Sequence, residues 1–138
     1  MSLKYLLDTN IISDSMRPIP NPKVEDKLRI NQLEVCTATV VIHELLYGCL
    51  RLPKSKKRSF FEEYLNDLML KLPLLNYDLK SAQYHAQERA RLSKIGKSPA
   101  FVDGQIASIA FTNNLTLVTN NIDDFQDFQG LVIDNWFL

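Results

Sequence analysis

Short apolar runs alternate with longer helical patterns along the chain. The apolar runs predict strands at residues 4–7, 34–38, 74–77, 115–119 and 131–133. Periodic apolar positions, together with capping and stopping residues, predict helices over residues 21–30, 39–52, 54–71, 78–96 and 98–113. In three of these helices Asn21, Thr39 and Asp78 are the expected caps. Strands that alternate with helices of this length predict an α/β fold with a parallel, doubly wound sheet.

Length and composition then predict one domain over residues 1–138. The chain is 46% hydrophobic and 23% charged, as in ordinary globular proteins. No apolar run approaches the ~18 residues needed to cross a bilayer, and no signal-peptide pattern is present. Cys36 and Cys49 lack metal-ligand spacing and are expected to be buried free thiols. We therefore expect a soluble, cytoplasmic protein without a membrane partner.

The net charge of zero hides an uneven distribution of charge. All sixteen Lys and Arg residues lie at or before Lys97, together with eleven acidic residues, and five acidic residues follow without any base. One stretch carries five bases and no acid: Arg51, Lys54, Lys56, Lys57 and Arg58. Such a distribution is compatible with a basic flank beside an acidic pocket.

Three carboxylates stand at unusual positions. Asp8 directly follows the first apolar strand, and in open parallel sheets ligands gather beyond the carboxyl ends of the strands. Glu44 and Asp103 each lie on a predicted helix face that is otherwise apolar. A buried, unpaired carboxylate costs several kcal/mol, so a compensating group is expected. Taken singly, Asp8 can also start a loop and cap Thr9-Asn10, and the other two can be surface ion-pair residues.

The predicted strand at 115–119 adds a fourth oxygen donor, because Asn121 follows it closely, with Asp123 and Asp124 just beyond. Several oxygen ligands with no Cys or His nearby suit Mg²⁺ or Mn²⁺ rather than Zn²⁺. The sequence contains no glycine-rich phosphate loop and no G-x-S-x-G elbow. The two histidines, His43 and His85, have no partner spacing and are interpreted as structural.

Read in order, these motifs resemble a PIN domain and, more narrowly, the VapC-type ribonuclease toxins of prokaryotic toxin–antitoxin pairs. The matching segments are LLDTNIIS at 6–13, HELLYG at 43–48, DGQIA at 103–107 and LVTNN at 117–121. Asp124-Phe125, Gly130-Leu131 and Asn135-Trp136 resemble the end of that family's pattern. The resemblance spans nearly the whole chain. One departure is Val41, which stands where the family often has a hydroxyl residue.

The resemblance implies a single domain with a five-stranded parallel sheet flanked by helices. It also implies Mg²⁺-dependent endonucleolytic cleavage of RNA, with Mn²⁺ as a substitute, and a homodimer bound by a small antitoxin. In the matching positions the metal ligands and catalytic residues would be Asp8, Glu44, Asp103 and Asn121. Thr119 would orient the site and Asn10 would brace its backbone. The basic stretch at 51–58 is then a candidate for RNA phosphates, and a solvated helix end is the alternative.

Two other functions are compatible with parts of the sequence. A catalytically silent interaction module would use the acidic pocket to bind a cation or a partner's arginine. An aspartyl-phosphate receiver domain is also small and doubly wound, but it needs a lysine after a late strand. This chain has no lysine after Lys97. The sequence therefore favours a ribonuclease, without identifying which RNA it cleaves.

Overall fold

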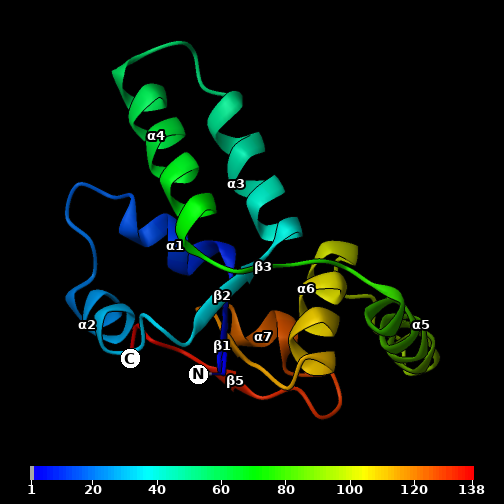
Figure 1. Ribbon diagram of the computed structural model, residues 1–138. Helices are drawn as coiled ribbons and strands as arrows, with labels where there is room; N and C mark the ends of the chain where they lie inside the picture. The colour runs from blue at the N-terminus through cyan, green and yellow to red at the C-terminus, as the bar shows by residue number, and fades with distance from the viewer. Residues whose placement is uncertain (1) are drawn as a thin grey trace.

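A parallel five-stranded sheet forms the centre of the protein (Figure 1). The computed structural model describes residues 2–138. The strands are β1 (Tyr5–Leu7), β2 (Val35–Ala38), β3 (Leu74–Leu75), β4 (Thr116–Val118) and β5 (Ile133–Asp134), in the order β3-β2-β1-β4-β5. Every pairing is parallel, with Leu6 opposite both Cys36 and Leu117. The α/β fold class and the parallel sheet predicted from the sequence are confirmed.

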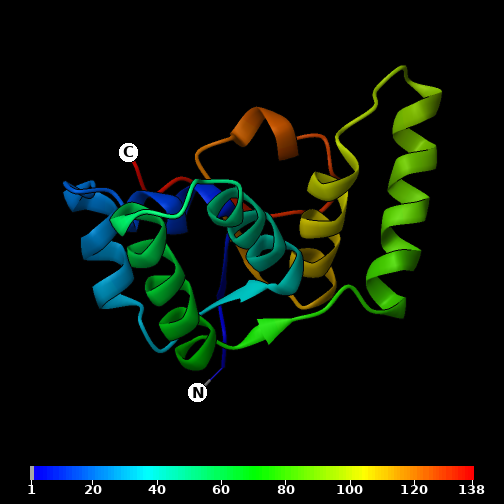
Figure 2. The same cartoon turned by 90° about the horizontal axis from the view of Figure 1, so that it is seen from above.

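Seven helices connect the strands in residues 2–138. They are α1 (Thr9–Ser15), α2 (Pro22–Ile30), α3 (Thr39–Leu50), α4 (Lys56–Lys71), α5 (Leu79–Lys94), α6 (Phe101–Thr112) and α7 (Ile122–Phe125). Figure 2 shows α2 and α4 on one side of the sheet and α5 and α6 on the other. Helix α3 contacts both α4 and α6, and with α4 it forms a hairpin that projects from the sheet (Figure 1). None of these helices is both long and apolar enough to cross a membrane.

The core forms where the apolar strands meet the inner faces of the helices. Leu6 and Leu117 on adjacent strands are fully buried, as are Ile11 on α1 and Ile106 on α6. Trp136, which is 1% exposed, packs edge-on against Tyr5 and donates from Nε1 to Asp134. Burial of such side chains is the main favourable term in folding. Both cysteines are buried and free, as the sequence predicts.

The order of the strands creates a topological switch point at the middle of the sheet. From β1 the chain moves outward to β2 and β3, then returns to place β4 on the other side of β1. The connections after β1 and β4 therefore leave in opposite directions and open a crevice at the carboxyl ends of these two strands. The residues that follow these strands, Asp8 and Thr119, stand at this crevice.

Several predicted boundaries are wrong in detail. The short helices α1 and α7 were not predicted, and α6 begins at Phe101 rather than at residue 98. Thr39 is not the cap of α3: Ala38 holds that position without a side-chain bond, while the Thr39 hydroxyl donates to the Leu75 carbonyl. The hydroxyl is engaged there because β2 and β3 are paired immediately before it. By contrast, Asn21 and Asp78 cap their helices as predicted.

Candidate functional site

Asp8 lies at the centre of the crevice and is held by three neighbouring residues. Its side chain is buried and caps α1, and Asp8 Oδ1 accepts a hydrogen bond from the Thr9 backbone amide at 2.8 Å. Its Oδ2 accepts from the Thr119 hydroxyl at 2.8 Å and from the Asn10 amide at 3.2 Å. Burial raises the pKa of Asp8 from its ordinary value, and the hydrogen bonds from Thr119, Thr9 and Asn10 oppose that shift.

Asn10 and Thr119 tie the two strand ends together. Besides its bond to Asp8, the Asn10 amide donates to the Thr119 hydroxyl at 3.1 Å, and Asn10 Oδ1 accepts from the Asn120 backbone amide at 2.9 Å. The Thr119 hydroxyl also accepts from the Asn121 backbone amide at 3.0 Å. The start of α1 and the turn after β4 are therefore fixed relative to each other, and the Asp8 carboxylate is oriented between them.

Glu44 and Asp103 approach the same space from two helices. Glu44 on α3 is half-buried, and its Oε1 accepts from the Thr9 hydroxyl at 3.0 Å. Asp103 lies in the first turn of α6 and is also half-buried. Burial and, to a lesser extent, the negative charges of Asp124, Asp8 and Glu44 raise the pKa of Asp103 to about 6. The carboxylates therefore repel one another across the crevice.

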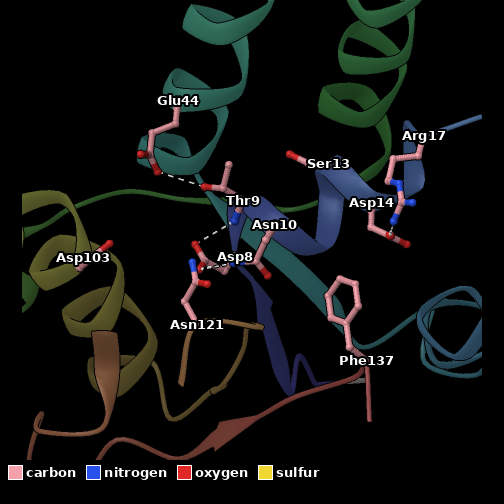
Figure 3. A pocket seen from close by; sticks show the side chains of 10 residues that line it. All are labelled: Asp8, Thr9, Asn10, Ser13, Asp14, Arg17, Glu44, Asp103, Asn121 and Phe137. Atoms are coloured by element: carbon pink, nitrogen blue, oxygen red, sulfur yellow. Dashed lines mark hydrogen bonds and ion pairs between the residues drawn. The ribbon is translucent and has the colours of Figure 1, made fainter. Parts of the chain in front are cut away.

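One pocket of about 480 Å³ contains all four predicted site residues. Figure 3 shows Asp8 in the middle, Glu44 above it, Asp103 on one side and Asn121 directly below. Asn121 precedes α7 and makes no side-chain capping bond, so its amide is available to the pocket. Neither His43 nor His85 lines the pocket; His43 is exposed, and His85 is buried and bonded to the Tyr77 hydroxyl.

The donor set of this pocket fits a hard divalent cation. Asp8, Glu44, Asp103 and Asn121 offer oxygen atoms, and no thiol or imidazole lines the space. Burial and the neighbouring negative charges both raise the pKa of Asp103, and a bound cation would offset both effects. Nevertheless, no three His, Cys, Asp or Glu side chains in residues 2–138 converge closely enough to hold one ion as they stand.

The raised pKa of Asp103 leads to a prediction for the stability of the metal-free protein. Because the folded pKa of about 6 exceeds the ordinary 3.8, the folded state binds this proton more tightly, and the free energy of unfolding falls as pH rises from about 4 to 6. Asp103→Asn removes this penalty. In EDTA at pH 7.5 its melting temperature should exceed that of the wild type by a few degrees, and the difference should vanish near pH 4. Equal melting temperatures at both pH values would contradict the predicted repulsion.

The five basic residues that were predicted to bind RNA phosphates lie at the far end of the α3–α4 hairpin. Some of their side chains contact other parts of the fold, and others are exposed. Arg58 is engaged within the fold: its Nε donates to Glu62 at 2.6 Å, and its Nη1 donates to the Leu52 carbonyl. Arg51 lies over the Tyr47 ring, and Lys57 lies over the Phe61 ring. Lys57 also lines an apolar groove that adjoins the carboxylate pocket. Lys54 and Lys56 are exposed.

Several residues that line the carboxylate pocket were not predicted from the sequence. Helix α1 and the residue after its C-cap contribute one polar face, on which Ser13, Asp14 and Arg17 lie beside the predicted Asn10. Their spacing of three and four residues is the helical signal that could have found them. Phe137 also lines the pocket, although it lies far from the other lining residues in the sequence.

Comparisons with known proteins place this geometry in a family. The PIN domain model matches residues 5–131. The tRNA(fMet)-specific endonuclease VapC of Shigella flexneri is 31% identical over 134 residues, 97% of this chain and 98% of that protein. Toxin FitB of Neisseria gonorrhoeae is 34% identical over 135 residues, 95% of this chain and 97% of that protein. The structure of DNA-bound VapBC from Salmonella typhimurium contains a chain with a TM-score of 0.86 and 28% identity, covering 97% of this chain and 98% of that one. The chain therefore belongs to the PIN-domain family and, within it, to the VapC ribonucleases.

Proposed function

We propose that this protein is a Mg²⁺-dependent endoribonuclease that acts as the toxin of a toxin–antitoxin pair. The observation that carries the proposal is the single pocket that contains Asp8, Glu44, Asp103 and Asn121 at the switch point of the sheet. Its relatives support the reaction, since the Shigella protein is named an endonuclease for tRNA(fMet) and the gonococcal protein a toxin.

The carboxylates of Asp8, Glu44 and Asp103 and the amide oxygen of Asn121 would hold the metal ions. When bound there, Mg²⁺ or Mn²⁺ supplies a water of lowered pKa and stabilises the negative charge that develops on the phosphate and the leaving oxygen. The exposure of Asp123 and Asp124 next to Asn121 leaves both available as further oxygen donors.

The other residues of the site would keep these oxygens in position. Thr119 and Asn10 donate to Asp8 Oδ2 and so favour its charged form and fix its orientation. Thr9 acts on two carboxylates, because its amide donates to Asp8 and its hydroxyl donates to Glu44 Oε1. This arrangement leaves Glu44 Oε2 for a ligand. Such preorganisation lowers the cost of assembling the site around substrate.

Cleavage of defined RNAs by the purified protein tests the proposal. The protein would be stripped with EDTA and incubated with initiator tRNA, elongator tRNAs and total cellular RNA, with and without Mg²⁺ or Mn²⁺. We expect internal cuts only when a divalent ion is restored, and sequencing of the fragments would identify the RNA. If no RNA is cut with either ion, the silent interaction module becomes the better description.

The amide at Asn121 predicts a measurable weakness in metal binding. An Asn in place of a fourth carboxylate leaves three formal negative charges for up to two divalent ions. Asn121→Asp should therefore lower the Mg²⁺ concentration for half-maximal cleavage by about tenfold, the effect of ~1.4 kcal/mol of added attraction. Asn66→Asp, an exposed change on α4, is the matched control. An unchanged Mg²⁺ titration would place Asn121 away from the ions and favour Asp123 or Asp124.

We further propose a homodimer and a small antitoxin as protein partners. VapBC complexes among the structural relatives support an antitoxin. The apolar groove beside the carboxylate pocket has a volume of about 420 Å³ and includes Leu45, Leu52 and Phe61, so it suits apolar side chains. Light scattering of the purified chain tests the dimer.

The antitoxin should block the site with a basic side chain. Arginine suits a pocket of carboxylates because its planar fork pairs with them and keeps its charge. We expect excess Mn²⁺ to weaken inhibition, because the ion and the partner's arginine compete for Glu44 and Asp103. Replacing that arginine by alanine should restore cleavage before the complex dissociates. Inhibition that ignores both metal and every basic residue of the partner would contradict this model.

A further inference from the structure

The carboxylate pocket has a second end with a different chemical character. Arg17 and Phe137 line it together with Asp14, on the opposite side of Asn10 from Glu44 and Asp103 (Figure 3). Among the described residues that line the carboxylate pocket, Arg17 is the only cationic one. Phe137 is the only aromatic one, and its ring points into the pocket. This end therefore combines a positive charge with an apolar ring.

Arg17 is anchored by a buried carboxylate. Its Nη1 donates to Asp14 Oδ1 at 3.0 Å, and Asp14 is only 3% exposed. The other oxygen of Asp14 accepts from the Asn21 backbone amide at 2.9 Å, so the carboxylate also holds the loop that carries Arg17. The guanidinium has five N–H donors, and this ion pair uses one of them. The remaining donors are available to a ligand, since 63% of the side chain is exposed.

Phe137 is held in place by its two predecessors. Trp136 is buried against Tyr5 and anchors the segment in the core. Asn135 Oδ1 accepts from the Phe137 backbone amide at 2.9 Å, while Asn135 Nδ2 donates to Asn120 Oδ1 at 3.1 Å. The segment is thereby joined to the turn that precedes Asn121. The half-buried Phe137 ring has one side packed against the core, which leaves its other side for the pocket.

We propose that Arg17 and Phe137 form a nucleotide subsite next to the scissile bond, in which Arg17 binds the flanking phosphate and Phe137 stacks on the flanking base. The inference rests on the proposed ribonuclease function and deepens it. The metal ions proposed at the carboxylate end would bind the scissile phosphate, so the flanking phosphate needs a separate cation, which Arg17 supplies. Unstacked RNA bases commonly stack on aromatic rings. In this arrangement the substrate is held at one end of the pocket and cut at the other.

Steady-state cleavage of a labelled single-stranded RNA of about 12 nucleotides tests the role of Arg17. Arg17→Ala should raise KM about tenfold with little change in kcat, because it removes binding that is equal in ground and transition states. It should also reduce the slope of log KM against log salt by ~0.7 between about 50 and 200 mM KCl. Arg17→Lys should retain the salt slope. Arg29→Ala is the matched control, since Arg29 pairs with Asp26 at the same spacing but lies outside the pocket.

Replacing Phe137 should also raise KM, but without a change in its salt dependence. Phe137→Leu keeps apolar volume but loses the aromatic face, so KM should rise about fivefold or more while the salt slope stays unchanged. An abasic residue beside the cleavage site should weaken binding to the wild type but have little effect on binding to Phe137→Leu. Phe60→Leu, which changes an exposed aromatic residue outside both pockets, should behave like the wild type.

The ribonuclease function and the nucleotide subsite can be contradicted by different results. If the wild type cuts no RNA, the ribonuclease function fails. If the wild type cuts RNA but Arg17→Ala and Phe137→Leu keep its KM, salt slope and abasic sensitivity, the nucleotide subsite is overturned. Unchanged RNA kinetics with weakened antitoxin binding would assign this end of the pocket to the protein partner. A loss of activity that follows a loss of melting temperature in Arg17→Ala, and that Arg17→Lys does not share, would reduce Arg17 to a structural residue.

Discussion

Asp8→Asn, Glu44→Gln and Asp103→Asn are each expected to lower RNA cleavage by at least about 10³-fold while the protein remains folded. Each change removes one negative charge from the pocket but keeps the size of the side chain. The remaining oxygens would bind divalent ions weakly, and the attacking water would lose its activation. Cleavage rates at saturating Mg²⁺, measured beside melting curves and growth of expressing cells, check the prediction.

A variant of a carboxylate outside the pocket serves as the control for this experiment. Asp26→Asn removes an exposed charge on α2 that pairs with Arg29, so its activity should equal that of the wild type. Asp8→Asn is the most demanding of the three variants for folding, because Asp8 accepts bonds from Thr9, Asn10 and Thr119. Wild-type rates in any of the three pocket variants would remove that residue from the catalytic set.

Gly104→Ala should strongly destabilise the fold. A Cβ at this position would collide with the ring of His85, where α5 packs against α6. The ring has little room to move, because its Nδ1 is bonded to the Tyr77 hydroxyl at 2.8 Å and Phe101 packs beside it. We expect a loss of about 3 kcal/mol in the free energy of unfolding, equivalent to a fall of about 10 °C in melting temperature.

A second glycine provides the control for this prediction. Gly48 is also within a helix, but a Cβ there would meet nothing within 4 Å. Gly48→Ala should therefore preserve or raise the melting temperature, because alanine favours helix by ~1 kcal/mol. Adding His85→Ala to Gly104→Ala should recover part of the lost stability if the collision is its cause. A Gly104→Ala protein as stable as the wild type would show that the two helices separate at little cost.

The pattern of apolar residues predicted the longer elements well and the short ones poorly. Helices α3, α4 and α5 each carry several turns of periodic apolar positions, which dominate local preferences. Helix α1 has seven residues, TNIISDS, most of which are weak helix formers. It forms because Asp8 caps it and because Ile11 and Ile12 are buried against the core. Those are tertiary effects that a local pattern does not contain.

A similar limit applies to the site. Glu44 and Asp103 were detected because each interrupts an apolar helix face, and Asp8 was detected because it follows a strand. Arg17 was missed because its approach to the pocket depends on α1 and on the loop that Asp14 holds. Phe137 was missed because nothing near it in the sequence relates it to the other lining residues. Arg17 and Phe137 reach the same pocket because of the way the strands and helices are connected, and a local sequence pattern does not contain that information.

The bond between Asp8 and Thr119 joins residues 111 positions apart. During synthesis the first half of the site is therefore made long before the second, and Asp8 has no partner across the sheet until β4 has left the ribosome and paired with β1. Partial chains of this protein should accordingly carry the Asp8 and Glu44 carboxylates without an ordered pocket around them. We therefore expect nuclease activity to begin only after β4 has been made and has paired with β1, late in the synthesis of the chain.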